Sequence, residues 1–316
     1  MGVTRRAIVC VLLCGFTSSA PAAISPGKAS LFTASHIAQI SIRVDERGLA
    51  TLGDHPRTYV PAQVKVDGDV WEQVGLRIKG RQGSLRAVDD KPSLTLDFDH
   101  WRLGQACHGQ TKLHLNNCVE DPTYLNEVLA AWMCERARIS FPRVAHATVS
   151  LNGRNLGLFL LKQSFEDMLQ EKSHPPSSLY EPVRGGDVDQ PFERKMGPEP
   201  PPGQALADLA RIAQEPDLSL RQEDLKRLLK ITGFLQFMSM EVLLGHRDGY
   251  CISKNNVRLS FDPITKQWEF LLAGTDQLLG NPKLPWQPEM SGLVARSVLQ
   301  VPEFKRAYRS EFERLL

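Results

Sequence analysis

A predicted β-hairpin constrains the fold of this chain more than any other feature. The runs 257–261 and 267–272 have the length and apolar content of short strands. Between them, residues 262–266 begin with an Asp-Pro pair, which favours a tight turn. Pairing of the two strands would place Asn256 close to Leu272.

Four polar residues flank this hairpin: Asp248, Asn255 and Asn256 precede it, and Asp276 follows it. Because a hairpin returns the chain on itself, Asp276 is expected to lie a few residues from both Asn side chains. In phosphoryl-transfer enzymes of the protein-kinase type, an Asp that takes the hydroxyl proton is followed by an Asn and a second Asp that hold metal ions on the phosphates. Asp248 is therefore a candidate catalytic residue, and the other three are candidate metal ligands.

Each of these residues also has a purely structural interpretation. Asp248 can satisfy a turn before Gly249, and Asn255 with Asn256 can form an ordinary turn pair. The sequence does not say which Asn faces the site.

Residues 1–23 have the pattern of a secretory signal peptide. Arg5 and Arg6 precede an apolar run over residues 7–16, and small residues follow at 18–23. A membrane anchor is the alternative, but the apolar run is too short to span a bilayer comfortably. We expect a secreted or periplasmic protein with no stable membrane span after cleavage.

Composition excludes some classes of function and leaves the disulfides open. A formal net charge of +2 gives no electrostatic argument for nucleic-acid binding. No Cys-X-X-Cys or His-Glu-X-X-His pattern supports a zinc site. Four cysteines follow residue 23, and an oxidising compartment predicts one or two disulfides among them, with Cys134 as a buried free thiol in the alternative. These cysteines are Cys107, Cys118, Cys134 and Cys251.

Residues 24–170 are predicted to form a β-rich N-terminal lobe. Strand-like alternation with turn residues predicts strands over 40–52, 63–79 and 91–98. Runs 148–151 and 156–161 flank Asn152-Gly153, which suits a hairpin turn. One helix is expected to begin at Asp121-Pro122, with Asp121 as its cap. Its buried face is expected to carry Leu125, Val128, Leu129 and Trp132.

The remaining chain divides at a segment rich in Pro, Gly and charge. Residues 171–204 are predicted to be a linker or an ordered surface loop. Residues 205–316 are predicted to form a mainly helical lobe that carries the hairpin. Its expected helices cover 205–213, a second segment capped by Ser219 with Gln222, a buried helix over 231–244, and a last one over 304–316.

An ordered set of short motifs resembles the spore coat protein CotH family of atypical secreted kinases. The matching residues are Arg77 to Gly80 with Lys91 to Leu96, Leu113 to Asn117 with Asp121, Asn152-Gly153 with Gly157 to Leu161, His246 to Tyr250, Asn255-Asn256, and Asp276 to Gly280. Each motif is short, but their order along residues 70–285 is fairly specific.

The resemblance implies an α+β, atypical protein-kinase-like two-lobed fold over residues 40–316. It implies transfer of a phosphoryl group from ATP to protein Ser or Thr. Lys91 would hold the nucleotide phosphates, with Lys79 and Arg77 as rival contacts. Asp248 would be the catalytic Asp, and Mg²⁺, or alternatively Mn²⁺, would bind Asp276 with Asn255 or Asn256.

Two positions depart from the family pattern. The acidic residue expected to pair with the nucleotide lysine falls on Gln163, which cannot neutralise Lys91. The first of two expected Asp residues falls on Gly274, so Asp276 is left as the single carboxylate. These departures keep an alternative open, in which a degenerate pseudokinase serves as a binding protein or an envelope or coat scaffold.

Overall fold

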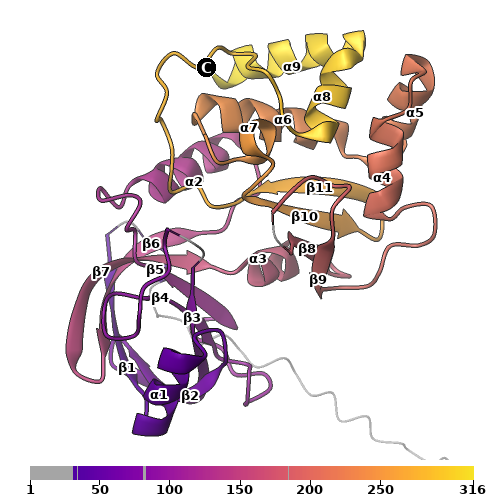
Figure 1. The fold of residues 1–316 in the computed structure, drawn as a ribbon. Coiled ribbons are helices and arrows are strands. Elements are labelled where there is room, and N and C mark those ends of the chain that lie inside the picture. The colour runs from indigo at the N-terminus through magenta and orange to yellow at the C-terminus, as the bar shows by residue number, and fades with distance from the viewer. Residues whose placement is uncertain (1–30, 34, 81–82, 184) are drawn as a thin grey trace, which may run out of the picture. The chain divides into compact units, whose positions relative to one another are not determined.

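A closed barrel of seven strands forms the N-terminal part of the computed structural model, which describes residues 31–316 except 34, 81–82 and 184 (Figure 1). The strand order is β1-β2-β3-β4-β5-β7-β6, and parallel pairing of β6 with β1 closes the barrel. Helix α1 (Glu46–Asp54) follows β1, and α2 (Asn126–Ala137) lies between β5 and β6 in the chain. The strands are β1 (Ile37–Arg43), β2 (Val60–Val66), β3 (Asp69–Lys79), β4 (Ser93–Asp97), β5 (Lys112–Asn116), β6 (Val144–Leu151) and β7 (Arg154–Gln163).

Alternation of side chains explains the barrel. Apolar residues such as Leu76, Leu96 and Leu115 are fully buried in its interior cluster. Polar or charged residues that alternate with them lie on the outer face, among them Arg77, Thr95, His114 and Lys162. Strand register places Arg77 opposite Thr95, Thr95 opposite His114, and His114 opposite Lys162.

The second part is a four-stranded sheet with helices. Its strand order is β11-β10-β8-β9, and the predicted hairpin is confirmed, because β10 pairs with β11 and Val257 lies opposite Leu272. Helix α6 packs on this sheet, with Phe234 4.6 Å from Phe270 between ring centroids (Figure 1). The elements are α3 (Phe165–Lys172), β8 (Ser178–Pro182), β9 (Phe192–Met196), α4 (Leu206–Ala213), α5 (Leu218–Leu228), α6 (Ile231–Leu243), α7 (Tyr250–Ser253), β10 (Val257–Asp262), β11 (Gln267–Leu272), α8 (Leu293–Gln300) and α9 (Pro302–Leu315).

The segment 171–204, for which composition predicts a linker or loop, contains two strands. Leu179 and Tyr180 in β8 pair with β10, and β9 continues the sheet beyond β8. Proline and glycine obscured these strands because they cluster in the loops on either side. The lobe boundaries at 170 and 204 stay predictions.

Helix starts were the least accurate predictions. The strand expected over 40–52 ends at Arg43, since Asp45 caps α1 by accepting from the Gly48 amide. Asp121 does not cap α2; its carboxylate closes a loop by accepting from Thr123 and Asn126. The Ser219–Gln222 box is absent too, because Asp217 caps α5.

The predicted buried face of α2 was only partly right: Leu129 is partly buried against the hydrophobic core. Leu125 is 56% exposed and Trp132 is 52% exposed. The helix instead buries Glu127, Ala130, Cys134 and Ala137. The buried face therefore includes a charged residue, Glu127, which an apolar pattern does not include.

The described residues confirm the α+β class, while the closed barrel leaves a two-lobed kinase-like arrangement as a prediction. Cys118, Cys134 and Cys251 are free thiols, so the expected disulfides do not form among these three. Burial raises the pKa of Cys134 to about 12, as expected for a structural thiol. Within the described part of the chain, no helix has the length and apolar character needed to cross a membrane. The predicted signal peptide lies outside the described residues.

Candidate functional site

Asp248 lies on the loop between α6 and α7, directly after a helix that is buried nearly all round. Its Oδ2 accepts hydrogen bonds from the Nδ2 atoms of Asn255, at 2.9 Å, and Asn256, at 2.8 Å. The structure therefore brings together three of the four residues that flank the hairpin. An Asp carboxylate held by two amide groups is fixed in orientation and still has lone pairs available.

A buried network holds this loop in place. The Glu241 carboxylate accepts from the backbone amides of Tyr250, at 3.0 Å, and Cys251, at 2.7 Å. His246 is fully buried, with Nδ1 3.6 Å from Glu241 Oε1. Burial opposes a charge on the imidazole, but the nearby Glu241 carboxylate outweighs it and raises the pKa of His246.

The same histidine connects the Asp248 loop to the segment after β11. His246 Nε2 lies 2.9 Å from the carbonyl oxygen of Gly274, to which it donates. Gly274 has φ +58°, and a Cβ there would lie only 2.5 Å from Asn256 Cγ. Glycine is therefore required at this position, because the Asn256 side chain fills the space that an Asp side chain would need.

These contacts distinguish the two Asn residues. Asn256 lies against Gly274, two residues before Asp276. Asn255 lies on the other side, where its Oδ1 would be 3.2 Å from a Cβ built at Gly185. Asn256 is therefore the amide on the side of the Asp276 segment.

Asp276 is a partly buried carboxylate in a negative environment. Burial, followed by the nearby Glu127 carboxylate, raises the pKa of Asp276 to about 6. Its backbone oxygen accepts from Asn126 Nδ2 at 2.6 Å, which ties the start of α2 to the segment after β11. A nearby cation would stabilise the ionised form of such a carboxylate.

The donor set fits magnesium better than a metal that needs several protein ligands. One carboxylate with an amide oxygen leaves room for phosphate oxygens and water, which Mg²⁺ prefers. Among the residues that the structure describes, no group of three or more His, Cys, Asp or Glu side chains is placed to hold an ion.

Sequence reasoning missed a buried lysine–glutamate pair. Lys162 of β7 donates to the carboxylate of Glu127 of α2, and both side chains are only 7% exposed. Glu127 also accepts from Asn116 Nδ2 at 2.7 Å, and Asn116 Oδ1 accepts from Lys79 Nζ at 2.8 Å. The local signal was a lysine at the end of the apolar run 158–161, with no sequence mark for its partner.

The outer face of the barrel around this pair is basic. Burial lowers the pKa of Lys79 to about 8. Arg77 lies two residues away on the same face, with its guanidinium 5.0 Å from the ring centroid of Tyr59. Cationic groups thus lie on one face of the barrel, Arg77 and Lys79 on β3 and Lys162 on β7, with β4 and β5 between them. This arrangement is suited to binding phosphate groups.

Lys91 and Gln163 lie elsewhere. Lys91 Nζ donates to Tyr124 Oη at 2.6 Å and lies 4.9 Å from the ring centroid of Phe159. Gln163 Oε1 accepts from the Arg143 backbone amide at 3.2 Å, and its Nε2 donates to Glu171. These partners show that Gln163 does not occupy the acidic half of the lysine–glutamate pair.

Asp248 and Asn255 open onto a polar pocket of about 770 Å³. Asp187 and Arg296 also line it. Asp187 Oδ1 accepts from Tyr250 Oη at 2.7 Å, so a buried hydrogen bond anchors the wall of this pocket to α7. The pocket offers access to Asp248 from solvent.

Comparison with known proteins agrees with the order of the motifs. A family model described as CotH kinase protein matches residues 76–316. No match is found among curated proteins. The matched segment covers well over half of the chain and includes the Lys162–Glu127 pair, Asp248 and Asp276. The chain therefore belongs to the CotH kinase protein family.

Proposed function

We propose that this chain is an exported phosphotransferase that moves the terminal phosphoryl group of ATP to protein Ser or Thr, or to another acceptor. One observation carries the proposal: the Asp248 carboxylate is held by both Asn255 and Asn256 beside the segment that leads to Asp276. Family membership supports it. A two-lobed kinase-like arrangement, with the barrel as one lobe, belongs to the same proposal.

Each residue has a role set by its surroundings. Asp248 accepts the proton of the acceptor hydroxyl, since its carboxylate faces a solvent-accessible pocket. Asp276 and Asn256 would hold Mg²⁺, or alternatively Mn²⁺, which neutralises phosphate charge when bound. Asn255 orients the Asp248 carboxylate.

The phosphates would contact the basic outer face of the barrel. Lys162 fits the role of the nucleotide lysine because a buried glutamate, Glu127, holds its amine in place, as the lysine–glutamate pair of protein kinases requires. Lys79 and Arg77 supply further positive charge. Lys91, by contrast, is engaged with Tyr124, so its contribution would require a change of partner.

Transfer of labelled phosphate tests the enzyme directly. The protein without residues 1–23, given γ-labelled ATP and Mg²⁺, should label itself or a generic protein substrate. Asp248→Asn should abolish labelling with little change in melting temperature, because an amide oxygen can still accept from one Asn. Retained labelling in Asp248→Asn would contradict the role of Asp248.

A scaffold without turnover is the second candidate, and Gly274 favours it. The residue leaves Asp276 as the only carboxylate of the metal site. In that case ATP with Mg²⁺ should raise the melting temperature while no label is transferred. Absence of both effects would leave only partner binding.

Export is also part of the proposal, since it rests on the sequence pattern of residues 1–23. A secreted or periplasmic kinase requires a local source of ATP or another phosphoryl donor. Retention of the protein in the cytoplasm after expression with its native N-terminus would contradict export.

A further inference from the structure

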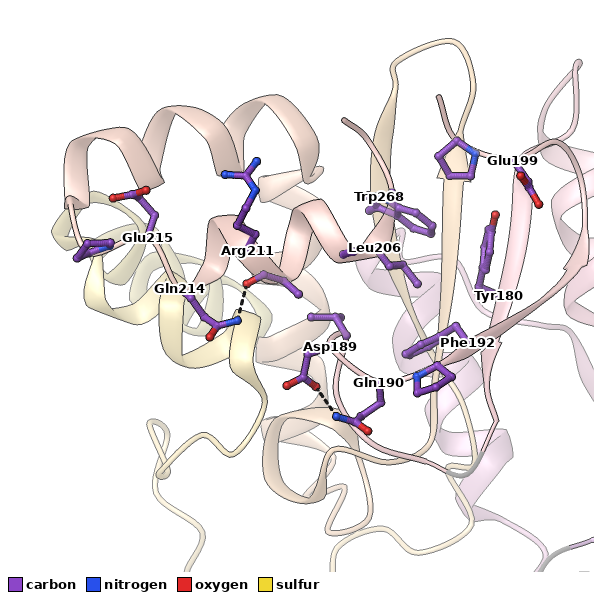
Figure 2. A pocket seen from close by; sticks show the side chains of 17 residues that line it. Tyr180, Asp189, Gln190, Phe192, Glu199, Leu206, Arg211, Gln214, Glu215 and Trp268 are labelled. Carbon is purple, nitrogen blue, oxygen red and sulfur yellow. Dashed lines mark hydrogen bonds between the residues drawn. The ribbon is translucent and has the colours of Figure 1, made fainter. Parts of the chain in front are cut away.

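A second pocket, of about 910 Å³, lies between α4 and the strands β8 and β9 (Figure 2). Its wall on the sheet side is apolar and carries Tyr180, Phe192 and Trp268, while Leu206 of α4 faces them (Figure 2). Large aromatic side chains that surround an open hollow are typical of sites that bind an apolar group.

This apolar pocket adjoins the polar pocket at Asp248. Asp189, Gln190 and Gln214 line both hollows. The β8–β9 loop forms their shared wall and is held to the Asp248 region, because the Gly186 amide donates to the carbonyl of Lys254 at 3.0 Å. A ligand that reaches Asp248 can therefore extend along one surface into the apolar pocket.

The apolar wall is pre-formed. Trp268 Nε1 donates to the Gln204 carbonyl at 2.8 Å, and the Trp268 ring meets Tyr180 edge-on with centroids 5.2 Å apart. Both side chains are buried: Trp268 is 0% exposed and Tyr180 is 8% exposed. A wall fixed in this way costs little conformational entropy when a ligand binds.

Charge around the pocket limits its occupant. Among the described residues, Asp189, Glu199 and Glu215 line it together with one base, Arg211. This balance disfavours anionic occupants such as a fatty acid or a second nucleotide. A neutral or cationic chain with an apolar side chain fits better.

We propose that this pocket is a docking subsite that binds an apolar side chain of the polypeptide acceptor while the acceptor hydroxyl lies at Asp248. The inference rests on the proposed phosphotransfer and adds a specificity determinant to it. A polypeptide is the occupant that can fill a polar and an apolar hollow at once through one continuous backbone.

Peptides with a fixed central Ser and one further fixed position, either Phe or Gly, test this subsite. All other positions are degenerate. The wild-type protein with γ-labelled ATP should prefer Phe over Gly at one position, or at neighbouring positions, relative to the central Ser. Labelling should rise about tenfold there, because burying a Phe side chain favours binding by about that factor.

Ala207→Trp fills the pocket from an exposed position of α4 and should remove the Phe preference while keeping the labelling of Gly peptides. Ala307→Trp on α9, exposed and outside the lining of both pockets, is the matched control and should keep the preference. Equal labelling of Phe and Gly peptides by the wild type, or a preference that persists in Ala207→Trp, would overturn the subsite.

Binding of the same peptides, measured by fluorescence anisotropy, separates this inference from the proposed catalysis. If no peptide is labelled, tighter binding of Phe peptides that Ala207→Trp removes still supports docking, whereas equal binding of Phe and Gly peptides overturns it. A wild-type dimer that Ala207→Trp converts to a monomer in light scattering would assign the pocket to a second copy of the chain and also overturn the inference.

Discussion

Removing the carboxylate of Glu127 should destabilise the protein severely, because it leaves the Lys162 amine without its counter-ion. Both side chains are 7% exposed, so water cannot replace the lost partner. Breaking such a buried pair costs about 3–5 kcal/mol. The Asn116 amide loses its acceptor as well. Because Asn116 in turn accepts from Lys79, the position of Lys79 is also weakened. We therefore expect Glu127→Ala to fall toward the upper end of that range.

A double-mutant cycle isolates the pair. Glu127→Leu combined with Lys162→Met removes both charges and should recover most of the stability, since neutral side chains of similar volume often replace a buried pair at little cost. Glu127→Gln is the matched control, because it keeps an acceptor for Asn116 and loses only the charge. Urea unfolding followed by tryptophan fluorescence gives the four free energies of unfolding, those of the wild type, Glu127→Leu, Lys162→Met and the double variant.

Two outcomes would refute this reasoning. A loss below about 1 kcal/mol for Glu127→Ala would mean that the pair is effectively solvated, as at a protein surface. A double variant as unstable as Glu127→Leu alone would mean that packing, not charge, accounts for the loss.

Three further predictions follow from the site. Asp276 must be ionised to bind Mg²⁺, and its pKa is raised to about 6. The Mg²⁺-dependent part of the ATP thermal shift, measured by scanning fluorimetry, should therefore be full near pH 8 and fade near pH 5. A flat pH profile would contradict this. Gly274→Ala, whose Cβ would lie 2.5 Å from Asn256 Cγ, should cost about 1–3 kcal/mol in urea unfolding and abolish labelling, whereas Gly280→Ala, with open space around it, should change neither. Gln163→Glu should give no gain in labelling with γ-labelled ATP, because the Gln163 side chain is hydrogen-bonded to Arg143 and Glu171; a gain would contradict the assignment of Glu127.

Local patterns predicted the parts of the fold that depend on neighbouring residues. The turn at Asn152-Gly153 joins β6 and β7 as expected, and both residues have positive φ. The Asp-Pro turn likewise joins β10 and β11. The buried α6 followed from a helix-length run of apolar residues. In each case the residues that carry the sequence pattern are the same residues that form the turn or helix.

The site was only partly predictable because some of its partners are far apart in sequence. Asp248, Asn255 and Asn256 lie within nine residues of one another, and the sequence placed them together. Glu127 and Lys162 are 35 residues apart and pair across a helix and a strand, which no periodicity reveals. Short-motif resemblance led to Lys91 and Gln163, because it records residue types in order and not which side chains share a face.

Binding of ATP with and without Mg²⁺ tests the central claim most directly, because the claim is that Asp276 and Asn256 hold a metal beside the phosphates that Lys162 contacts. At a hundredfold excess over its dissociation constant, a ligand adds about 2.7 kcal/mol of stability. The account predicts such a thermal shift for the wild type only when ATP and Mg²⁺ are both present, and its loss in Asp276→Asn. A shift of equal size without Mg²⁺, or one that Asp276→Asn leaves intact, would contradict it.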